Sequence, residues 1–116
     1  MTDDVVAKRY PYFNFYPQDW LGDYELGRCS LAAQGLWLAM LCVMHQSEPR
    51  GYLIEHGQPM SMKGLSRLVR TQSNRVYALV KELENNGVFS RSNEGIIYCR
   101  KMVHDTEKRT KLRVNG

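Results

Sequence analysis

Residues 61–85 read SMKGLSRLVRTQSNRVYALVKELEN, two amphipathic patterns separated by a few polar residues. Ser61 is a good N-cap, and the first pattern predicts a helix over about 62–69, with an apolar face of Met62, Leu65, Leu68 and Val69. The second pattern has apolar residues at helical spacing and predicts a helix over about 73–85, with a face of Val76, Leu79, Val80 and Leu83. The polar residues 70–74 leave only a short turn between the two helices.

A longer helix is predicted upstream, over about 31–46 with Ser30 as its N-cap. It is apolar on most sides, which is typical of a helix in the centre of a core; the apolar residues are Leu31, Leu36, Trp37, Leu38, Met40, Leu41, Val43 and Met44. Residues 51–54 are a candidate short strand, and residues 57–59 a candidate turn.

The residues that follow the 73–85 helix predict a β-hairpin. Asn86 and Gly87 are expected to end the preceding helix in the left-handed conformation. Residues 88–91 and 96–100 alternate in polarity around an Asn-Glu-Gly turn and predict two antiparallel strands.

The order helix, short strand, helix, tight turn, helix, hairpin is that of a winged helix-turn-helix. We therefore expect a mainly α protein with a small β-hairpin (α+β), specifically a winged helix-turn-helix. The expected organisation is a flexible tail over 1–9, the winged helix-turn-helix domain over 10–101 and a basic C-terminal helix or tail over 102–116.

Residues 10–24 hold seven of the chain's twelve aromatic residues. Pro11 and Pro17 predict an extended segment that turns near Gln18 and Asp19. One interpretation is an aromatic strap packed across the domain, with Trp20 and Trp37 buried; the other is a base-stacking platform for single-stranded nucleic acid. No Lys or Arg lies between residues 10 and 27, which favours the strap.

Composition and motifs argue against several classes of protein. The 116 residues suit one domain, and 10% aromatic content is too high for a disordered chain. The longest apolar run, residues 36–44, is too short to span a bilayer, and no basic-then-apolar leader follows Met1, so a cytoplasmic protein without a membrane partner is expected. Three scattered cysteines without CxxC spacing predict no disulfide framework, metal or cofactor. Isolated histidines and the absence of HExxH, GxSxG, Walker and GxGxxG motifs predict no enzymatic activity.

The charge is unevenly divided. Residues 1–60 hold four basic and seven acidic side chains, and residues 61–116 hold twelve basic and five acidic ones. A basic half favours a polyanionic partner such as double-stranded DNA, although small basic domains also use charge for solubility alone.

The predicted DNA-binding residues fall into three sets. The first surrounds the N-terminal end of the 73–85 helix and comprises Arg67, Arg70, Thr71, Gln72, Ser73, Asn74, Arg75 and Lys81. The second, Arg91, Arg100 and Lys101, belongs to the hairpin and would reach a phosphate backbone. The third, Lys108, Arg109 and Lys111, lies in the C-terminal segment. The alternative is a protein-binding module, because Glu82 and Glu84 would repel a deeply inserted duplex.

Several stretches carry a family resemblance: PYFNFYPQDWLGD (11–23), SLAAQGLWLAML (30–41), EPRGYL (48–53), GVFSR (87–91) and GIIYCRKMVHDTEKR (95–109). They resemble the N-terminal winged-helix domain of phage and prophage replication-initiation proteins, an uncharacterised phage-associated domain family. The YPxDWL and RxMVxD-type stretches are the most specific. The resemblance implies origin binding in replication initiation, or transcription control, and host replication proteins as partners. A phage-encoded inhibitor of another host protein, and a homodimer, stay open as alternatives.

Overall fold

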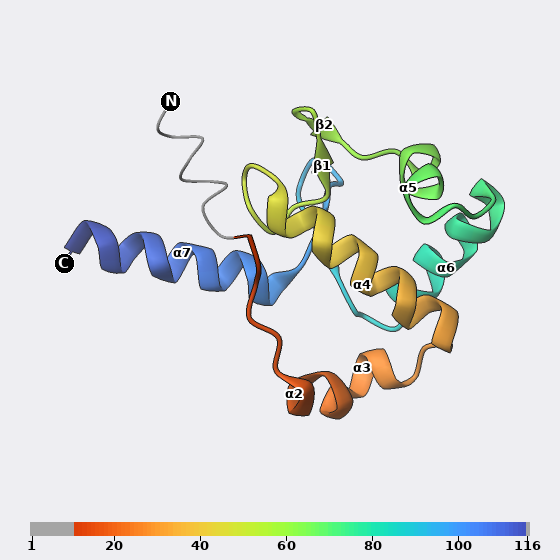
Figure 1. Ribbon diagram of the computed structural model, residues 1–116, viewed down its shortest axis with the longest axis horizontal. Helices are drawn as coiled ribbons and strands as arrows, with labels where there is room; N and C mark the ends of the chain where they lie inside the picture. Colours follow the sequence, from red (N-terminus) through yellow and green to blue (C-terminus); the bar gives the residue numbers. More distant parts are fainter. Residues whose placement is uncertain (1–10, 116) are drawn as a thin grey trace.

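The structure, a computed structural model, describes residues 11–115, with side chains as far as residue 112; the expected tail over 1–9 lies outside them. The elements in chain order are α2 (Pro17–Gly22), α3 (Tyr24–Gly27), α4 (Leu31–Gln46), β1 (Ile54–Glu55), β2 (Gln58–Pro59), α5 (Met62–Val69), α6 (Ser73–Asn85), β3 (Ser90–Arg91), β4 (Ile97–Tyr98) and α7 (Arg100–Asn115) (Figure 1). The mainly helical α+β class expected from the sequence is confirmed.

Helix α4 runs through the middle of the molecule and packs against α6, α5 and β1 (Figure 1). It begins where predicted, because the Ser30 hydroxyl accepts a hydrogen bond of 3.1 Å from the Ala33 N–H. Only one face is buried, however: Leu31 is 84% exposed and Leu38 is also exposed. The expectation of a helix buried on most sides was wrong, because the neighbouring elements cover only the face that carries Ala33, Leu36, Trp37, Met40, Leu41 and Met44.

Helices α5 and α6 have the predicted bounds and pack against each other. The whole predicted face of α6, from Val76 to Leu83, is buried. On α5, Leu65 is fully buried but Leu68 is half exposed, so its assignment to the apolar face was wrong. Ser66 takes part in the packing instead: its buried hydroxyl lies 3.2 Å from the Ser73 hydroxyl and ties α5 to the start of α6.

The turn between α5 and α6 depends on one unusual backbone conformation. Arg70 follows α5 with φ 56° and ψ 47°, in the left-handed region. This conformation reverses the chain at once, and the Thr71 N–H donates a hydrogen bond of 3.0 Å to the Ser66 carbonyl. Helix α6 therefore starts directly beside the end of α5.

The predicted hairpin is present as β3 and β4, with Ser90 opposite Tyr98 and Arg91 opposite Ile97. Its strands are shorter than expected, and Arg100, which was expected in the second strand, begins α7. The candidate strand near residue 52 joins its edge through a bridge between Tyr52 and Tyr98. Gly87 is left-handed as expected (φ 74°), but Asn86 is not (φ −96°), because its N–H still bonds to the Glu82 carbonyl at the end of α6.

A second hairpin lies between α4 and α5, where only a strand and a turn were predicted. Its turn is His56–Gly57, both with positive φ, and residues 58–59 form the returning strand β2. The expected turn over 57–59 was therefore wrong at both ends, because it begins at His56 and residues 58–59 belong to a strand. A two-residue turn with two positive φ angles needs a Gly, and Gly57 supplies it.

The aromatic N-terminal segment crosses α4 and meets α7. The expected turn near Gln18 and Asp19 is instead the first turn of α2, because Pro17 occupies the first helical position, where a proline is favourable. Phe13 packs on His45 of α4 with ring centroids 5.3 Å apart. The segment thus behaves as a strap over α4, and we call residues 11–25 the aromatic strap.

Helix α7 is attached to the core by its first turns. Met102 is buried in the core, and the Arg50 guanidinium donates to the Thr106 hydroxyl at 2.8 Å. The expected boundary between residues 101 and 102 falls inside this helix. From there α7 extends away from α5 and α6, along the longest axis of the molecule (Figure 1).

The two tryptophans differ in burial and should differ in their effect on stability. Trp37 is buried and stacks on Phe89 at 6.2 Å, whereas Trp20 in the strap is only half-buried. We predict that Trp37→Ala lowers the free energy of unfolding by about 3–5 kcal/mol. Trp20→Ala should cost about 1–2 kcal/mol, because less of the ring leaves water on folding. Urea unfolding followed by circular dichroism measures both; equal losses would contradict the assignment of the core to α4.

Candidate nucleic-acid interface

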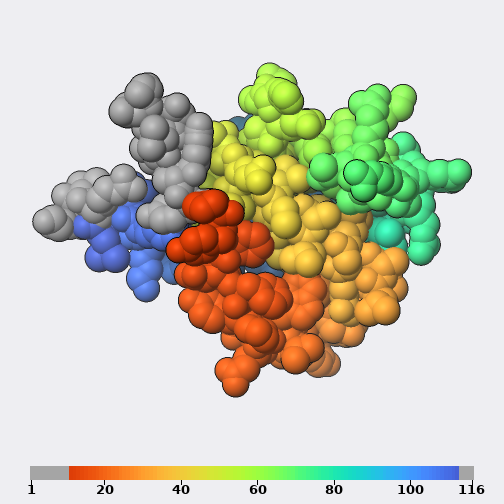
Figure 2. All heavy atoms as spheres, in the orientation of Figure 1, coloured from red at the N-terminus to blue at the C-terminus, as the bar shows by residue number. Residues whose placement is uncertain are grey.

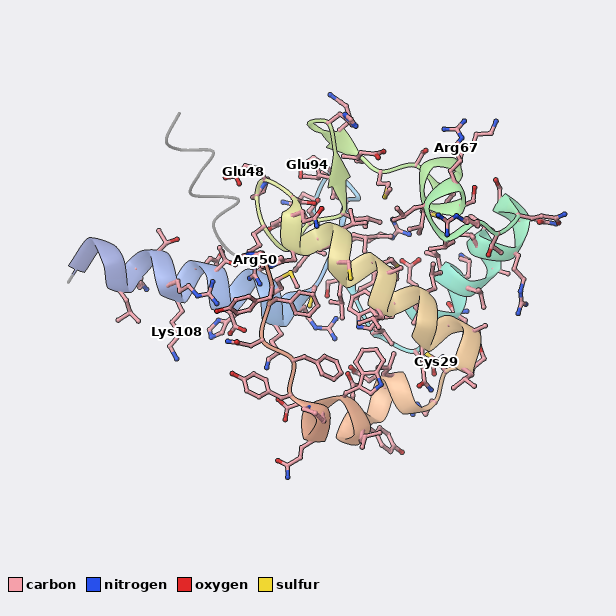
Figure 3. The ribbon with its side chains drawn as sticks, in the orientation of Figure 1. Cys29, Glu48, Arg50, Arg67, Glu94 and Lys108 are labelled. Atoms are coloured by element: carbon pink, nitrogen blue, oxygen red, sulfur yellow. The ribbon has the colours of Figure 1, made fainter. Side chains whose placement is uncertain are left out.

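The first predicted set lies together on one exposed surface, formed by the end of α5, the turn and the first turns of α6. Seven of its members, Arg67 and residues 70–75, are contiguous or one helical turn apart, and all are exposed. The left-handed Arg70 and the contact between Ser66 and Ser73 hold the two helix ends beside each other. Figure 3 shows Arg67 pointing from α5 into solvent. We call this surface the α5–α6 surface.

Its cations have no partners among the described side chains. Within residues 11–112, the side chains of Arg67, Arg70 and Arg75 make no hydrogen bond or ion pair. The sequence contains no Asp or Glu between residues 55 and 82, so no acidic side chain of this stretch neutralises them. The positive potential of this surface is therefore available to a ligand.

Sequence reasoning missed a fourth cation, Lys63. It is exposed on α5, and within the described side chains it also lacks a hydrogen-bond or ion-pair partner. Lys63 and Arg67 are four residues apart, so they share one face of the helix. From this spacing, Lys63 could have been added to the first predicted set of DNA-binding residues.

The N-terminus of α6 adds to this positive surface. Gln72 precedes the helix in an extended conformation, and its side chain does not cap the helix. Only Asn74 turns back locally, accepting a hydrogen bond of 2.9 Å from the Arg75 N–H. The first N–H groups of the helix, with the partial positive charge of the helix dipole, face the same solvent as the arginines.

Two members of the second set, Arg91 and Arg100, are paired within the protein, although both side chains remain exposed. Arg91 forms a bidentate contact with Glu84 of α6 at 2.8 and 3.0 Å and donates to the Gly95 carbonyl across its own hairpin. Arg100 donates to the Ser90 hydroxyl at 2.9 Å, to the Gly87 carbonyl at 2.8 Å and to Glu25 at 3.4 Å. These two arginines brace the β3–β4 hairpin against α6 and α3, and neither joins the α5–α6 surface.

The two acidic residues of α6 also have internal partners. Glu82 accepts hydrogen bonds from the backbone N–H and the hydroxyl of Ser30, and so connects α6 to the start of α4. Glu84 is neutralised by Arg91. The repulsion that these carboxylates would exert on a duplex is reduced for Glu84 by its pair. The charge of Lys81, which is exposed on α6, also lowers the pKa of Glu84, but less than the hydrogen bond and the charge of Arg91 do.

The third set lies at the other end of the molecule. Lys108 and Lys111 are exposed on α7, and Arg109 lines a pocket between α7 and the aromatic strap. Lys101 precedes them, with its ammonium 3.6 Å from Asp19 and 5.1 Å from the ring centroid of Tyr16. The longest dimension of the molecule is 44 Å, and α7 and the α5–α6 surface lie toward its two ends (Figure 1).

The chain matches no protein-family model, no curated protein and no solved structure. Within the described part of the chain, no three His, Cys, Asp or Glu side chains gather as ligands for a metal ion. Among the helices of that part, none has the length and apolar character needed to cross a bilayer.

The pair between Arg91 and Glu84 generates a pH prediction. The hydrogen bond from Arg91 lowers the pKa of Glu84 from its ordinary value of 4.5. A lowered carboxyl pKa stabilises the folded state above the unfolded-state pKa, and this stabilisation is lost as the pH falls through the lowered value. Both side chains are more than one third exposed, so solvent screening limits the contribution to about 1 kcal/mol or less.

We predict that Glu84→Gln reduces the loss of stability between pH 7 and pH 3 relative to the parent chain. Urea unfolding at the two pH values measures it. Arg91→Gln is the matched variant, because it leaves the carboxyl but removes the cause of the shift, and it should give a similarly reduced loss. Identical acid sensitivity in the parent and both variants would show that the pair does not form.

Proposed function

We propose that this protein binds double-stranded DNA through the α5–α6 surface, as a winged helix-turn-helix with α6 as the reading helix. The proposal rests on a difference between two groups of basic side chains, one without intramolecular partners and one with them. Lys63, Arg67, Arg70 and Arg75 are exposed around one helix end without a partner among the described side chains, whereas Arg91 of β3 and Arg100 at the start of α7 are paired. Exposed cations without an intramolecular partner, in a stretch that contains no Asp or Glu, can neutralise the phosphates of a DNA backbone.

The shape of α6 supports this role. Its apolar face is buried, which fixes the helix, and its opposite side exposes Asn74, Ala78 and Lys81 at spacings of four and three. The major groove of B-DNA admits an α-helix, and Asn and Arg side chains pair with the edges of adenine and guanine. The small side chain of Ala78 leaves room for a close approach between the middle of the helix and the bases.

The hairpin has a supporting role in this proposal. Its turn carries Glu94, and Arg91 of β3 is bound to α6 and to the hairpin backbone. Arg100 at the start of α7 is bound to Ser90 of β3 and to Glu25 of α3. The hairpin therefore holds the reading helix in place, and most phosphate contacts come from α5 and the turn. This differs from the contribution of Arg91, Arg100 and Lys101 expected from the sequence.

The biological setting rests on the resemblance to phage replication-initiation proteins. In our proposal, the DNA binding serves replication initiation or transcription control of a phage or prophage, without enzymatic activity. A protein partner is the second candidate, because Leu68 and Tyr77 are about half exposed beside the same cations. Such a partner, a second copy of the chain included, would bind with little dependence on salt.

The first prediction from this proposal concerns affinity. Arg67→Gln with Arg70→Gln should weaken binding about equally to all duplexes and reduce the slope of log affinity against log salt by about 0.9 for each phosphate that is no longer neutralised. Fluorescence anisotropy with a random duplex of about 25 base pairs, between about 50 and 200 mM salt, measures both quantities. Arg28→Gln is the control, because Arg28 is an exposed arginine stacked on Tyr24 outside this surface. A double variant that binds like the control would refute the site.

The second prediction concerns sequence preference. Asn74→Ala and Arg75→Ala should each reduce the discrimination between the preferred duplex and a mismatched one by about 1–3 kcal/mol, if each side chain reads one base. The preferred site is obtained first by selection from a random duplex library with the parent chain. If both variants discriminate as well as the parent does, α6 is not the reading helix.

A further inference from the structure

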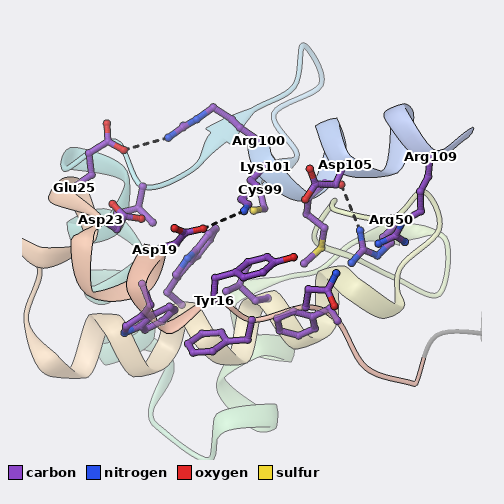
Figure 4. Close-up of a pocket in the computed structure, with 18 residues that line it drawn as sticks. Tyr16, Asp19, Asp23, Glu25, Arg50, Cys99, Arg100, Lys101, Asp105 and Arg109 are labelled. Atoms are coloured by element: carbon purple, nitrogen blue, oxygen red, sulfur yellow. Dashed lines mark hydrogen bonds and ion pairs between the residues drawn. The ribbon is translucent and has the colours of Figure 1, made fainter. Parts of the chain in front are cut away.

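A pocket of about 360 Å³ lies between the aromatic strap and the start of α7 (Figure 4). Its floor is apolar and is formed by Trp37, Leu41, Val88 and Met102. Burial raises the pKa of the Cys99 thiol, so this pocket residue is neutral at pH 7. The volume is at the lower end of the range of about 300–1,000 Å³ for pockets that hold small organic ligands.

The rim of the pocket carries balanced charges. Four basic residues and four acidic residues line it: Arg50, Arg100, Lys101 and Arg109, and Asp19, Asp23, Glu25 and Asp105. A pocket without net charge does not favour a phosphate. It suits a neutral planar group that has an apolar face and hydrogen-bonding edges.

Exposed aromatic side chains of the strap lie beside this pocket. Tyr12, Phe15 and Tyr16 are 69%, 48% and 53% exposed, and they lie within five consecutive residues of the strap. Phe15 and Tyr16 also line the pocket, where Phe15 packs on Trp20 at 5.5 Å. Figure 2 shows this part of the chain, from red to orange, as a continuous surface that reaches α7. Exposed rings in succession are the platform on which the bases of a single strand stack.

The cations that the strap itself lacks come from α7. Lys101 lies over the Tyr16 ring at 5.1 Å, and its ion pair with Asp19 is long, at 3.6 Å, with both side chains at least 60% exposed. Such a pair is weak, so a phosphate can displace the carboxylate. The spacings from Lys101 to Asp105 and on to Lys108 are four and three residues, so exposed Lys108 continues the same face of α7. Figure 3 shows Lys108 projecting from the helix.

We propose that the strap and α7 form a second nucleic-acid site, which binds single-stranded nucleic acid. The pocket holds a base, the exposed rings stack on its neighbours, and the phosphates lie along Lys101, Lys108 and Lys111. A polyanion is favoured over an aromatic side chain of a protein partner, because residues 100–111 hold five basic and two acidic residues. Residues 10–27 contain no Lys or Arg, which argued against base stacking. Helix α7, about 80 residues later in the sequence, supplies the missing basic side chains.

This site is independent of the proposed duplex site. The two sites share none of the residues named for either, and α7 extends away from α5 and α6 (Figure 1). Variants of one surface therefore report on that surface alone. The failure of one proposal leaves the other in place.

The test compares a labelled oligo(dT) of about 12 nucleotides with an abasic oligonucleotide of equal length and charge, in about 50 mM salt, by fluorescence anisotropy. We expect the parent chain to bind oligo(dT) at least about fivefold more tightly, because the abasic strand has nothing to stack. Phe15→Leu with Tyr16→Leu should remove this preference and leave abasic binding unchanged. Leucine keeps apolar bulk at two half-exposed positions, and thermal melting confirms folding. Tyr24→Leu is the matched control and should retain the preference, because Tyr24 lies in α3, is 75% exposed, and belongs neither to the run of rings over residues 12–16 nor to the pocket.

Charge variants complete the test. Lys108→Gln with Lys111→Gln should weaken binding to both oligonucleotides equally and lower the salt slope by about 0.7 for each phosphate that is no longer neutralised. Arg67→Gln with Arg70→Gln should leave the preference for oligo(dT) intact. Three results would each overturn the proposal: equal binding of oligo(dT) and the abasic strand, no effect of the Phe15 and Tyr16 substitutions, or displacement of oligo(dT) by a neutral Trp-containing peptide at a lower concentration than unlabelled oligo(dT) requires. The last result would assign the pocket to a protein partner.

Discussion

The burial of one face of α6 against α4 is the contact on which the rest of this structure depends. Val76, Val80 and Leu83 of α6 are at most 2% exposed, and Ala33, Met40 and Met44 of α4 have no exposed surface. The small Ala33 side chain at the start of α4 lets the two helices approach closely. Glu82 then holds that end of α4 through Ser30. With one face fixed in this way, the opposite face of α6 and its N-terminus must be exposed to solvent.

The arginines fall into two groups, those that bond to other parts of the protein and those whose side chains have no such partner among the described residues. Arg50, Arg91 and Arg100 donate hydrogen bonds within the protein, and each connects segments that the chain places apart. Arg67, Arg70 and Arg75 make no such bonds among the described side chains. Guanidinium groups are suited to both tasks, since their donors match carbonyls, carboxylates and phosphates alike. Net charge by itself therefore does not reveal which arginines are available to a ligand.

The sequence was sufficient for α4, α5 and α6 because the signals for these helices are local. Ser30 and Ser61 cap α4 and α5 within three residues, and the spacing of Val76 to Leu83 encodes the buried face of α6. It was insufficient for the pairing of Arg100 with Glu25, which are 75 residues apart, and for the position of Lys101 over Tyr16. These contacts depend on how the strap and α7 cross, and no local pattern encodes that crossing. The exposure of Leu31 and Leu38 was missed for the same reason, because the extent to which other elements surround α4 is a property of the fold.

The left-handed conformation of Arg70 bears on how this protein could be made more stable. A residue with a Cβ atom in that region carries about 1–3 kcal/mol of backbone strain, which a glycine would not. Arg70 makes no hydrogen bond or ion pair through its side chain among the described residues, so a glycine would keep the backbone hydrogen bonds of the turn and lose no side-chain contact there. A search for thermostable variants would therefore select glycine here and would remove a charge from the end of α5. Stability and charge are in conflict at this one position, and the natural chain has kept the charge.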